Sequence, residues 1–314
     1  MSQPISPITL RSSSYVAVVD VEMGSTVLSL QWLTADGRSH DLLVPSGPGN
    51  NAFDAGCFIM APFTNRIADG TFLFEGERIS FPVNQPAQGN AIHGLARERP
   101  WEIVEQGPES LTTIDRCRDD GSGYTYDLTQ TIRLDHQGAS FELSVVNCGP
   151  APRPFGLGYH PWFVRSPAAR LAFHAETKFR HDSRGLPEAP RGIGEGCDFA
   201  GPAGQPVPSS LHAHYAGWAP RNAELLLPTS GLAILMSAGG ALTNLQIYAP
   251  EGRETICIEP VSHIPDIHNR PELARYGDIT VLKPGERLVG SMTIAATKLT
   301  PLSTVVREGV GKPT

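Results

Sequence analysis

The sequence predicts an all-β protein, a large antiparallel β-sandwich with very little helix. Many short runs alternate apolar and polar residues, which places apolar side chains on one face of a strand. The 314 residues include 32 glycines and 28 prolines, which suits many strands joined by turns and argues against a helical bundle. With 40% hydrophobic and 18% charged residues, the chain can bury a sizeable core.

Predicted strands follow one another along most of the chain. The clearest runs are 15–19, 25–32, 126–134, 140–147, 171–175, 224–227, 232–236, 245–248, 255–259 and 288–295. One short helix is predicted at 271–276, because Pro271 suits the first turn of a helix.

A Gly- and Pro-rich segment at 187–210 is the one place where the chain could divide. Strands of the same character lie on both sides of it, so it is interpreted as a long loop. We therefore expect a single domain over residues 1–314, with its core over roughly 10–300 and a loose C-terminal tail from about Val306.

Charge and composition exclude several classes of function. A formal net charge of −7 gives no electrostatic footprint for nucleic acid or anionic membranes. No apolar stretch approaches the ~20 residues of a membrane helix, and the N-terminus lacks a secretory signal. The five cysteines contain no C-x-x-C pair, which favours reduced thiols and a cytoplasmic location. No nucleotide-binding or serine-hydrolase motif is present, and we expect no cofactor.

Glu259 ends the apolar run Thr255-Ile-Cys-Ile-Glu, and Pro260 is expected to end strand pairing immediately after it. Alternation places Glu259 on the same face as Cys257. A carboxylate at the mouth of a sandwich, partly desolvated, has a raised pKa that suits a general base. The alternative is an ordinary strand-end glutamate in water, which spacing alone favours.

His160 lies in the run Phe-Gly-Leu-Gly-Tyr-His-Pro-Trp-Phe. Gly156 and Gly158 allow close approach of the backbone, and the aromatic neighbours could form an apolar wall for a sugar ring. Pro161 restricts His160 to extended backbone geometry. A histidine in this setting could act as a general acid near neutral pH, and a buried structural histidine is an equally good interpretation.

Other candidates are weaker. His93, Asn65 and Arg66 offer groups that bind hydroxyls, although structural roles and surface ion pairs are commoner. Asp266 and Asn269, in a polar turn segment, are expected to brace a loop. Trp32 and Trp101 are expected in the core.

His212 and His214 would lie on one face of a strand and could bind a metal as a pair. No carboxylate follows at matching spacing, so no metal site is expected.

These fragments, in this order, resemble the aldose 1-epimerase (galactose mutarotase-like) family. The matching segments span roughly Phe58 to Thr293, and six short motifs in the right order make the resemblance specific. They are Asn65-Arg66-Ile67 with Gly70, His93-Gly94 with Trp101, His160-Pro161-Trp162-Phe163, Leu245-Gln246-Ile247-Tyr248, Glu259-Pro260 with Pro265-Asp266, and Leu282-Lys283-Pro284-Gly285-Glu286.

The resemblance implies a many-stranded supersandwich and an enzyme that interconverts the α and β anomers of a free sugar without a cofactor. It implies His160 as the acid that protonates the ring oxygen and Glu259 as the base that deprotonates the anomeric hydroxyl. A Glu⁻ and HisH⁺ pair would give a bell-shaped pH–rate profile. The implied substrate-binding residues are Asn65, Arg66, His93, Trp162 and Gln246, and we expect a monomer or a homodimer.

One departure concerns the sugar. The family's pattern has an aspartate where this chain, in Leu211-His-Ala-His-Tyr-Ala-Gly-Trp218, has His212. Galactose specificity is therefore in doubt, and a pentose, a deoxy sugar or an acid sugar becomes plausible. Two alternatives stay open. One is a hexose-6-phosphate mutarotase, for which Arg97 and Arg99 could bind phosphate, and the other is a non-catalytic sugar-binding module.

Overall fold

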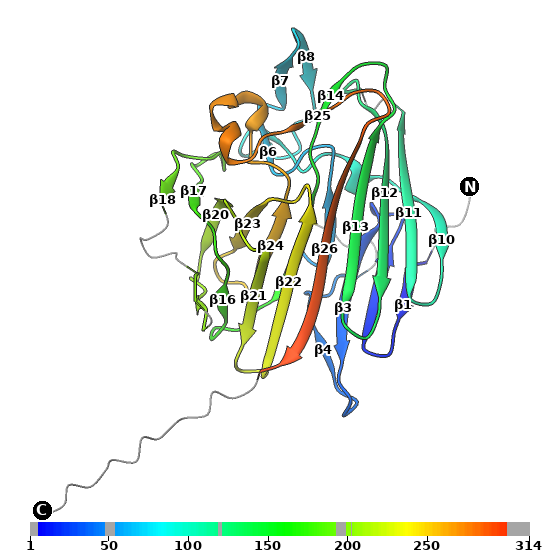
Figure 1. Cartoon of the computed structure of the whole chain (residues 1–314), viewed down its shortest axis with the longest axis vertical. Helices are drawn as coiled ribbons and strands as arrows, with labels where there is room; N and C mark the ends of the chain where they lie inside the picture. Colours follow the sequence, from blue (N-terminus) through cyan, green and yellow to red (C-terminus); the bar gives the residue numbers. More distant parts are fainter. Residues whose placement is uncertain (1–5, 48–53, 119–120, 193–198, 202, 300–314) are drawn as a thin grey trace, which may run out of the picture.

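The structure, a computed structural model, describes residues 6–47, 54–118, 121–192, 199–201 and 203–299. Two large sheets dominate it, and every pairing between its named strands is antiparallel (Figure 1). This confirms the predicted all-β class. In the view of Figure 1, β23 and β24 of the first sheet pass behind β21 and β22 of the second.

The first sheet has 11 strands. In spatial order they are β1 (Ile8–Arg11), β2 (Tyr15–Asp20), β3 (Thr26–Leu33), β5 (Cys57–Met60), β15 (Gly158–Val164), β24 (Thr255–Val261), β23 (Asn244–Ala249), β20 (Leu211–Ala216), β17 (Thr177–Arg180) and β18 (Arg191–Gly192), with β4 (Ser39–Asp41) beside β3. The central strands of this sheet therefore come from distant parts of the chain.

The second sheet has nine strands. They are β10 (Glu102–Gln106), β11 (Ser110–Arg118), β12 (Thr125–Leu134), β13 (Ala139–Asn147), β26 (Arg287–Lys298), β22 (Leu232–Gly240), β21 (Asn222–Leu227), β16 (Arg170–Ala172) and β19 (Gln205–Pro206). Three two-stranded pairs lie outside the large sheets: β6 (Arg66–Ala68) with β9 (Asn90–Ile92), β7 (Thr71–Phe74) with β8 (Glu77–Ser80), and β14 (Arg153–Phe155) with β25 (Thr280–Leu282).

Helix is scarce in the described residues, as expected. It consists of the 3-10 helices η1 (Ala96–Glu98), η2 (Ile267–Asn269) and η3 (Pro271–Tyr276). The predicted helix at 271–276 is therefore present, in the tighter 3-10 form. Within the described part of the chain, no helix has the length and apolar character required to cross a membrane.

The main hydrophobic core lies between the two large sheets. Alternation sends Ile59 and Tyr159 inward from the first sheet and Phe141 and Leu143 inward from the second, and all four belong to one buried cluster. The rings of Tyr159 and Phe141 meet across the interface, with centroids 5.9 Å apart. Because successive side chains alternate, the neighbours of Ile59 and Tyr159 point to the opposite, outer face of the first sheet.

Pro260 corrects one expectation about β24. The strand continues to Val261, and Pro260 pairs with Leu245 of β23. An antiparallel residue donates its N–H to one neighbour only, so a proline can interrupt one side of a strand and leave the other side paired. Here the pairs with β15 lie at Gly158 and from Trp162 to Val164, with a gap between them.

The segment 187–210 contributes β18 and β19, which extend the edges of the first and second sheets respectively. Residues 193–198 and 202 of this segment lie outside the described residues, as does the predicted C-terminal tail.

Candidate active site

One row of side chains crosses the outer face of the first sheet. Strand register places Phe58 beside His160, Gln246 beside Glu259, and His214 beside Gln246. The pairs Gly158–Val261 and Trp162–Cys257 bracket the gap between β15 and β24, which sets His160 level with Glu259. Residues level with each other on neighbouring strands point to the same face. The two predicted catalytic side chains are therefore brought together by register.

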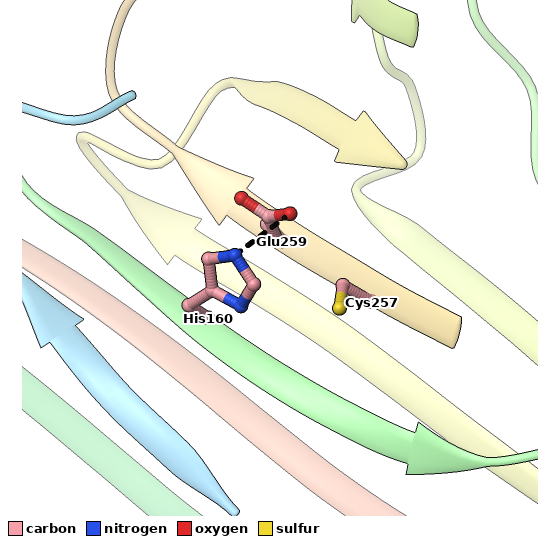
Figure 2. Close-up of side chains that lie close together, drawn as sticks. All are labelled: His160, Cys257 and Glu259. Atoms are coloured by element: carbon pink, nitrogen blue, oxygen red, sulfur yellow. Dashed lines mark ion pairs between the residues drawn. The ribbon is translucent and has the colours of Figure 1, made fainter. Parts of the chain in front are cut away.

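His160 and Glu259 are in direct contact. The imidazole Nε2 lies 3.3 Å from the carboxylate Oε1, and both side chains are almost fully buried (Figure 2). In Figure 2, His160 projects from one strand, and Glu259 and Cys257 project from the next strand toward the same side. His160 Nδ1 and Glu259 Oε2 are buried without a hydrogen-bond partner among the described residues. Each group thus keeps one polar atom available for a ligand.

Two aromatic rings stack on the imidazole of His160. The ring of Phe58 stacks at 4.4 Å between centroids with planes 21° apart, and that of Trp162 stacks at 5.3 Å and 26°. The guanidinium of Arg97 lies 4.9 Å from the Phe58 ring, and that of Arg253 lies 5.2 Å from the Trp162 ring. His160 therefore stacks with two rings, each of which also lies near a guanidinium group, and this packing restricts rotation of the imidazole.

A second wall comes from the β6–β9 pair. Arg66 Nη1 donates to Asn65 Oδ1 at 3.0 Å, and Arg66 Nε donates to Gln88 Oε1 at 3.0 Å. The His93 N–H donates to the Asn65 carbonyl at 2.8 Å. Asn65 and His93 both have positive φ, 56° and 64°, a conformation uncommon outside glycine and concentrated at functional sites.

Two features fix this wall against the rest of the molecule. Gly94 follows His93, and a Cβ there would lie 1.9 Å from the Ala61 carbonyl oxygen, so only glycine allows the approach. Asp266 Oδ1 accepts from the Ala68 N–H and from Asn269 Nδ2, each at 2.9 Å. Asp266 and Asn269 were expected to brace a loop, and here Asp266 also braces β6, the strand that carries Arg66.

A cavity of about 530 Å³ opens over the row of side chains. This volume falls in the range of small-ligand sites. Its walls consist of Asp54, Phe58, Asn65, Arg66, Asn84, Gln85, Gln88, Ile92, His93, Arg97, Glu98, His160, Trp162, His212, Tyr248, Arg253 and Glu259. Amides, guanidinium groups and aromatic rings together suit a polyhydroxylated ring with apolar faces.

Burial controls the ionisation of the central pair. Desolvation raises the pKa of Glu259 well above its ordinary 4.5, opposed by the charge of Arg66. Desolvation, followed by the charge of Arg97, lowers the pKa of His160 from 6.5 to about 3. Both shifts favour the uncharged forms. In this uncharged form the pair holds one proton, and transfer of that proton across the 3.3 Å contact would create Glu⁻ and HisH⁺ without a proton from solvent.

Comparison with known proteins identifies the family. A model of the family described as aldose 1-epimerase matches residues 6–295. This chain belongs to the aldose 1-epimerase family. The uncharacterized protein YphB of Escherichia coli (strain K12) is 30% identical over an alignment of 269 residues, and the match covers 81% of this chain and 88% of YphB.

Solved structures agree with that assignment. A protein named "Putative aldose 1-epimerase" from Escherichia coli K12 has a TM-score of 0.83 and 27% identity, over 94% of this chain and 99% of the other. A galactose mutarotase-like protein from Clostridium acetobutylicum shares the fold, with a TM-score of 0.81 and 19% identity over 93% and 95% of the two chains. Family and fold together support an epimerase-type isomerase.

Most of the site residues expected from the resemblance to the aldose 1-epimerase family line the cavity. Asn65, Arg66, His93, His160, Trp162 and Glu259 all do so. Gln246 does not. It lies beside Glu259 in the sheet, where its Oε1 is 3.3 Å from His214 Nδ1 and its Nε2 has no partner among the described residues.

The two arginines considered for phosphate binding have different positions. Arg97 lines the cavity, and its Nη2 lies 3.8 Å from Glu98 Oε1. Arg99 is not a wall residue, and its guanidinium instead donates to Asp115 and to the Tyr126 hydroxyl. Only Arg97 of this pair can therefore contact a ligand in the cavity.

His212 and His214 also have different surroundings. His212 lines the cavity, with its ring 3.9 Å from that of His181 and 5.2 Å from that of Tyr248. Both ring nitrogens of His214 are engaged, Nδ1 with Gln246 and Nε2 with Asn244 at 2.9 Å. The considered metal pair is therefore not formed.

Several wall residues were not predicted as site residues. Asn84, Gln85 and Gln88 come from the loop before β9, Tyr248 and Arg253 lie near Trp162, and Asp54 forms an ion pair with Arg253. Only Tyr248 had a sequence signal, as the fourth residue of the Leu245-Gln-Ile-Tyr segment.

Proposed function

We propose that this protein is an aldose 1-epimerase that interconverts the α and β anomers of a free aldose, with His160 as the acid and Glu259 as the base. The observation that carries the proposal is the 3.3 Å contact between His160 Nε2 and Glu259 Oε1 at the floor of a cavity suited to a sugar. Anomerisation requires one proton to leave the hydroxyl on C1 and one to reach the ring oxygen. Both oxygens are bonded to the same carbon, so two groups side by side can serve both.

The reaction balances within the pair. Glu259 takes the proton of the anomeric hydroxyl while His160 gives its proton to the ring oxygen, and the bond between C1 and the ring oxygen breaks. The open aldehyde turns about its C1–C2 bond, and the ring oxygen attacks the other face of the carbonyl. As the ring closes, His160 takes back the proton of the attacking hydroxyl and Glu259 returns its proton to the carbonyl oxygen, so no covalent enzyme intermediate forms.

The burial of the pair is consistent with this use. The uncharged form, GluH with His, and the ionic form, Glu⁻ with HisH⁺, contain the same number of protons. Burial favours the uncharged form before the sugar binds. Arg66 lowers the pKa of Glu259 and so favours the ionic form that starts the reaction.

Arg66, Asn65 and His93 are proposed to bind sugar hydroxyls, and Trp162 to contact an apolar face of the ring. Their placement on the cavity wall supports these roles. The indole Nε1 of Trp162 and Nδ1 of His93 are buried without a partner among the described residues. Unpaired polar atoms of this kind are costly unless a ligand or water pairs with them.

Polarimetry on freshly dissolved single anomers of hexoses and pentoses tests the proposal. Acceleration of mutarotation for at least one aldose is expected. No acceleration over a broad panel, with sugar binding detected by calorimetry, would instead indicate a non-catalytic sugar-binding module. No acceleration and no binding would reject both.

A phosphorylated aldose is the second candidate substrate, because the buried Arg97 side chain lines the cavity. The same rates with glucose and glucose-6-phosphate would remove the reason to prefer it. A higher kcat/KM for the phosphate ester, lost in Arg97→Gln and retained in Arg99→Gln, would establish it.

A further inference from the structure

Cys257 forms a compact cluster with the acid–base pair. A donor atom of Cys257, His160 and Glu259 each lies within 4.8 Å of the donor atoms of the other two, and all three residues are buried (Figure 2). Cys257 and Glu259 are two residues apart on β24, so alternation points both toward the same side. The reaction proposed above gives no role to this thiol.

We propose that His160, Cys257 and Glu259 form a binding site for Zn²⁺, and that the bound ion inhibits the enzyme by occupying the acid and the base. Imidazole, thiolate and carboxylate are ligands that Zn²⁺ takes in proteins. Sequence reasoning considered a metal only at His212 and His214, because His160 and Cys257 are far apart in the chain.

The distances agree with a tetrahedral ion. Nitrogen and oxygen ligands lie about 2.0–2.1 Å from Zn²⁺, which places two of them about 3.3 Å apart at a tetrahedral angle. His160 Nε2 and Glu259 Oε1 already have this separation, 3.3 Å. The thiolate–zinc bond is longer, about 2.3 Å, which places the sulfur about 3.6 Å from each of the other two ligand atoms. Cys257 Sγ lies within 4.8 Å of both, so ion binding draws it about 1 Å closer at most.

The fourth position of the ion would face the cavity, which both His160 and Glu259 line. Water or a sugar hydroxyl can fill it. Binding releases the thiol proton of Cys257 and the proton held by the pair to solvent, and no electron is transferred. Zinc affinity therefore increases with pH.

The neighbouring charges limit the affinity. Arg66, Arg97 and Arg253 line the same cavity and repel a cation, whereas Asp54 and Glu98 lie on the wall and attract one. His93 and His212 also face the cavity and remain as neutral neighbours. We therefore expect reversible inhibition that a chelator removes, rather than a resident ion required for folding.

The test compares Zn²⁺ inhibition of the unaltered protein, Cys257→Ser and Cys57→Ser. Cys57 is the matched control, because it is also buried, lies in the same sheet on β5, which is separated from β24 by β15, and is not part of the cluster. We expect inhibition that competes with sugar, is reversed by EDTA, is weakened at least tenfold in Cys257→Ser and is unchanged in Cys57→Ser. Cys257→Ala replaces Cys257→Ser if the latter does not fold.

A second readout does not depend on activity. Co²⁺ in place of Zn²⁺ should give a thiolate-to-metal charge-transfer absorption in the near ultraviolet that is present in Cys57→Ser and absent in Cys257→Ser. Equal zinc sensitivity in the two variants, or no thiolate band with cobalt, would overturn the proposal. Activation by Zn²⁺ would overturn it as well. The cobalt band does not depend on catalysis. It therefore tests the metal site even if the protein does not catalyse the proposed reaction.

Discussion

The imidazole of His160 lies stacked against the ring of Phe58, with centroids 4.4 Å apart and planes 21° apart. Strand pairing causes this contact, because Phe58 of β5 is the register partner of His160 on β15. The stack fixes the direction of Nε2 toward Glu259, and so connects the aromatic packing of the outer face to the proposed chemistry.

Phe58→Leu should therefore reduce kcat roughly two- to tenfold, since a stacked aromatic pair contributes about 0.5–1.5 kcal/mol. KM should change little. Phe63→Leu is the control, because Phe63 is also buried but packs against Phe81. Steady-state kinetics on both variants checks this. If both variants lose kcat equally, the effect is general destabilisation and the stack has no positioning role.

The pH dependence of kcat/KM follows from the single proton of the pair. The pair is active only while it holds this one proton. Activity is lost at low pH, when a second proton binds, and at high pH, when the first proton leaves. Burial lowers the pKa of His160 to about 3 and raises that of Glu259 above 4.5, so the acid limb should lie well below 6.5. A profile of kcat/KM in the free enzyme should be bell-shaped. An acid limb at pH 6.5 would show that His160 titrates as an ordinary histidine.

Gln246 is expected to position Glu259 rather than to bind sugar. It is the register partner of Glu259, and it does not line the cavity. Gln246→Leu should lower kcat by less than about tenfold with KM nearly unchanged, because Gln246 lies beside Glu259 in the sheet and its amide nitrogen makes no hydrogen bond among the described residues. A higher KM at unchanged kcat would instead support the role in substrate binding that the family resemblance implies.

Acid should destabilise the fold through its buried histidines. Burial lowers the pKa of His93, His160, His181, His212, His214, His263 and His268. These groups bind protons in the unfolded chain below pH 6.5 but not in the folded one. Their contribution is full above pH 6.5 and is lost as the pH falls, by up to about 1.4 kcal/mol per pH unit for each. Glu259 has a raised pKa in the folded chain, so its protonation increases the stability of the fold as the pH falls, opposite to the effect of the histidines.

His268→Phe isolates this effect. Both ring nitrogens of His268 are buried without a partner among the described residues, and its ring lies 4.5 Å from that of Phe72. In urea unfolding, the variant should gain more stability relative to the unaltered protein at pH 5 than at pH 7.5. The same difference at both pH values would mean that packing, and not protonation, controls the change.

The local pattern of the sequence was enough for the fold class. Alternation predicted β12, β13 and β26 nearly to their ends, because these strands bury one face and expose the other. Short elements such as β18 and β19 lie in a Gly- and Pro-rich segment without alternation, so no local pattern predicted them. Pro260 was misjudged because the loss of an N–H affects only one side of a strand.

The site was predictable in part, for a physical reason. His160 and Glu259 could be proposed from motifs, but their contact depends on the register of β15 and β24, which are far apart in the sequence. The stack of Arg97, Phe58, His160, Trp162 and Arg253 also joins distant segments. Local patterns carry no information on such contacts, so the role of Phe58 and the place of Gln246 emerged only from the structure.

The central claim is that the His160–Glu259 pair moves the protons of anomerisation. Exchange NMR on an equilibrated aldose measures the rate between its α and β signals directly, and it can be run on the unaltered protein and on Glu259→Gln. We predict that the unaltered protein makes exchange faster than in buffer alone. In Glu259→Gln the catalysed exchange rate should fall about 10²–10⁴-fold, while calorimetry still detects sugar binding. Exchange at the full rate in folded Glu259→Gln would contradict the assignment of the base.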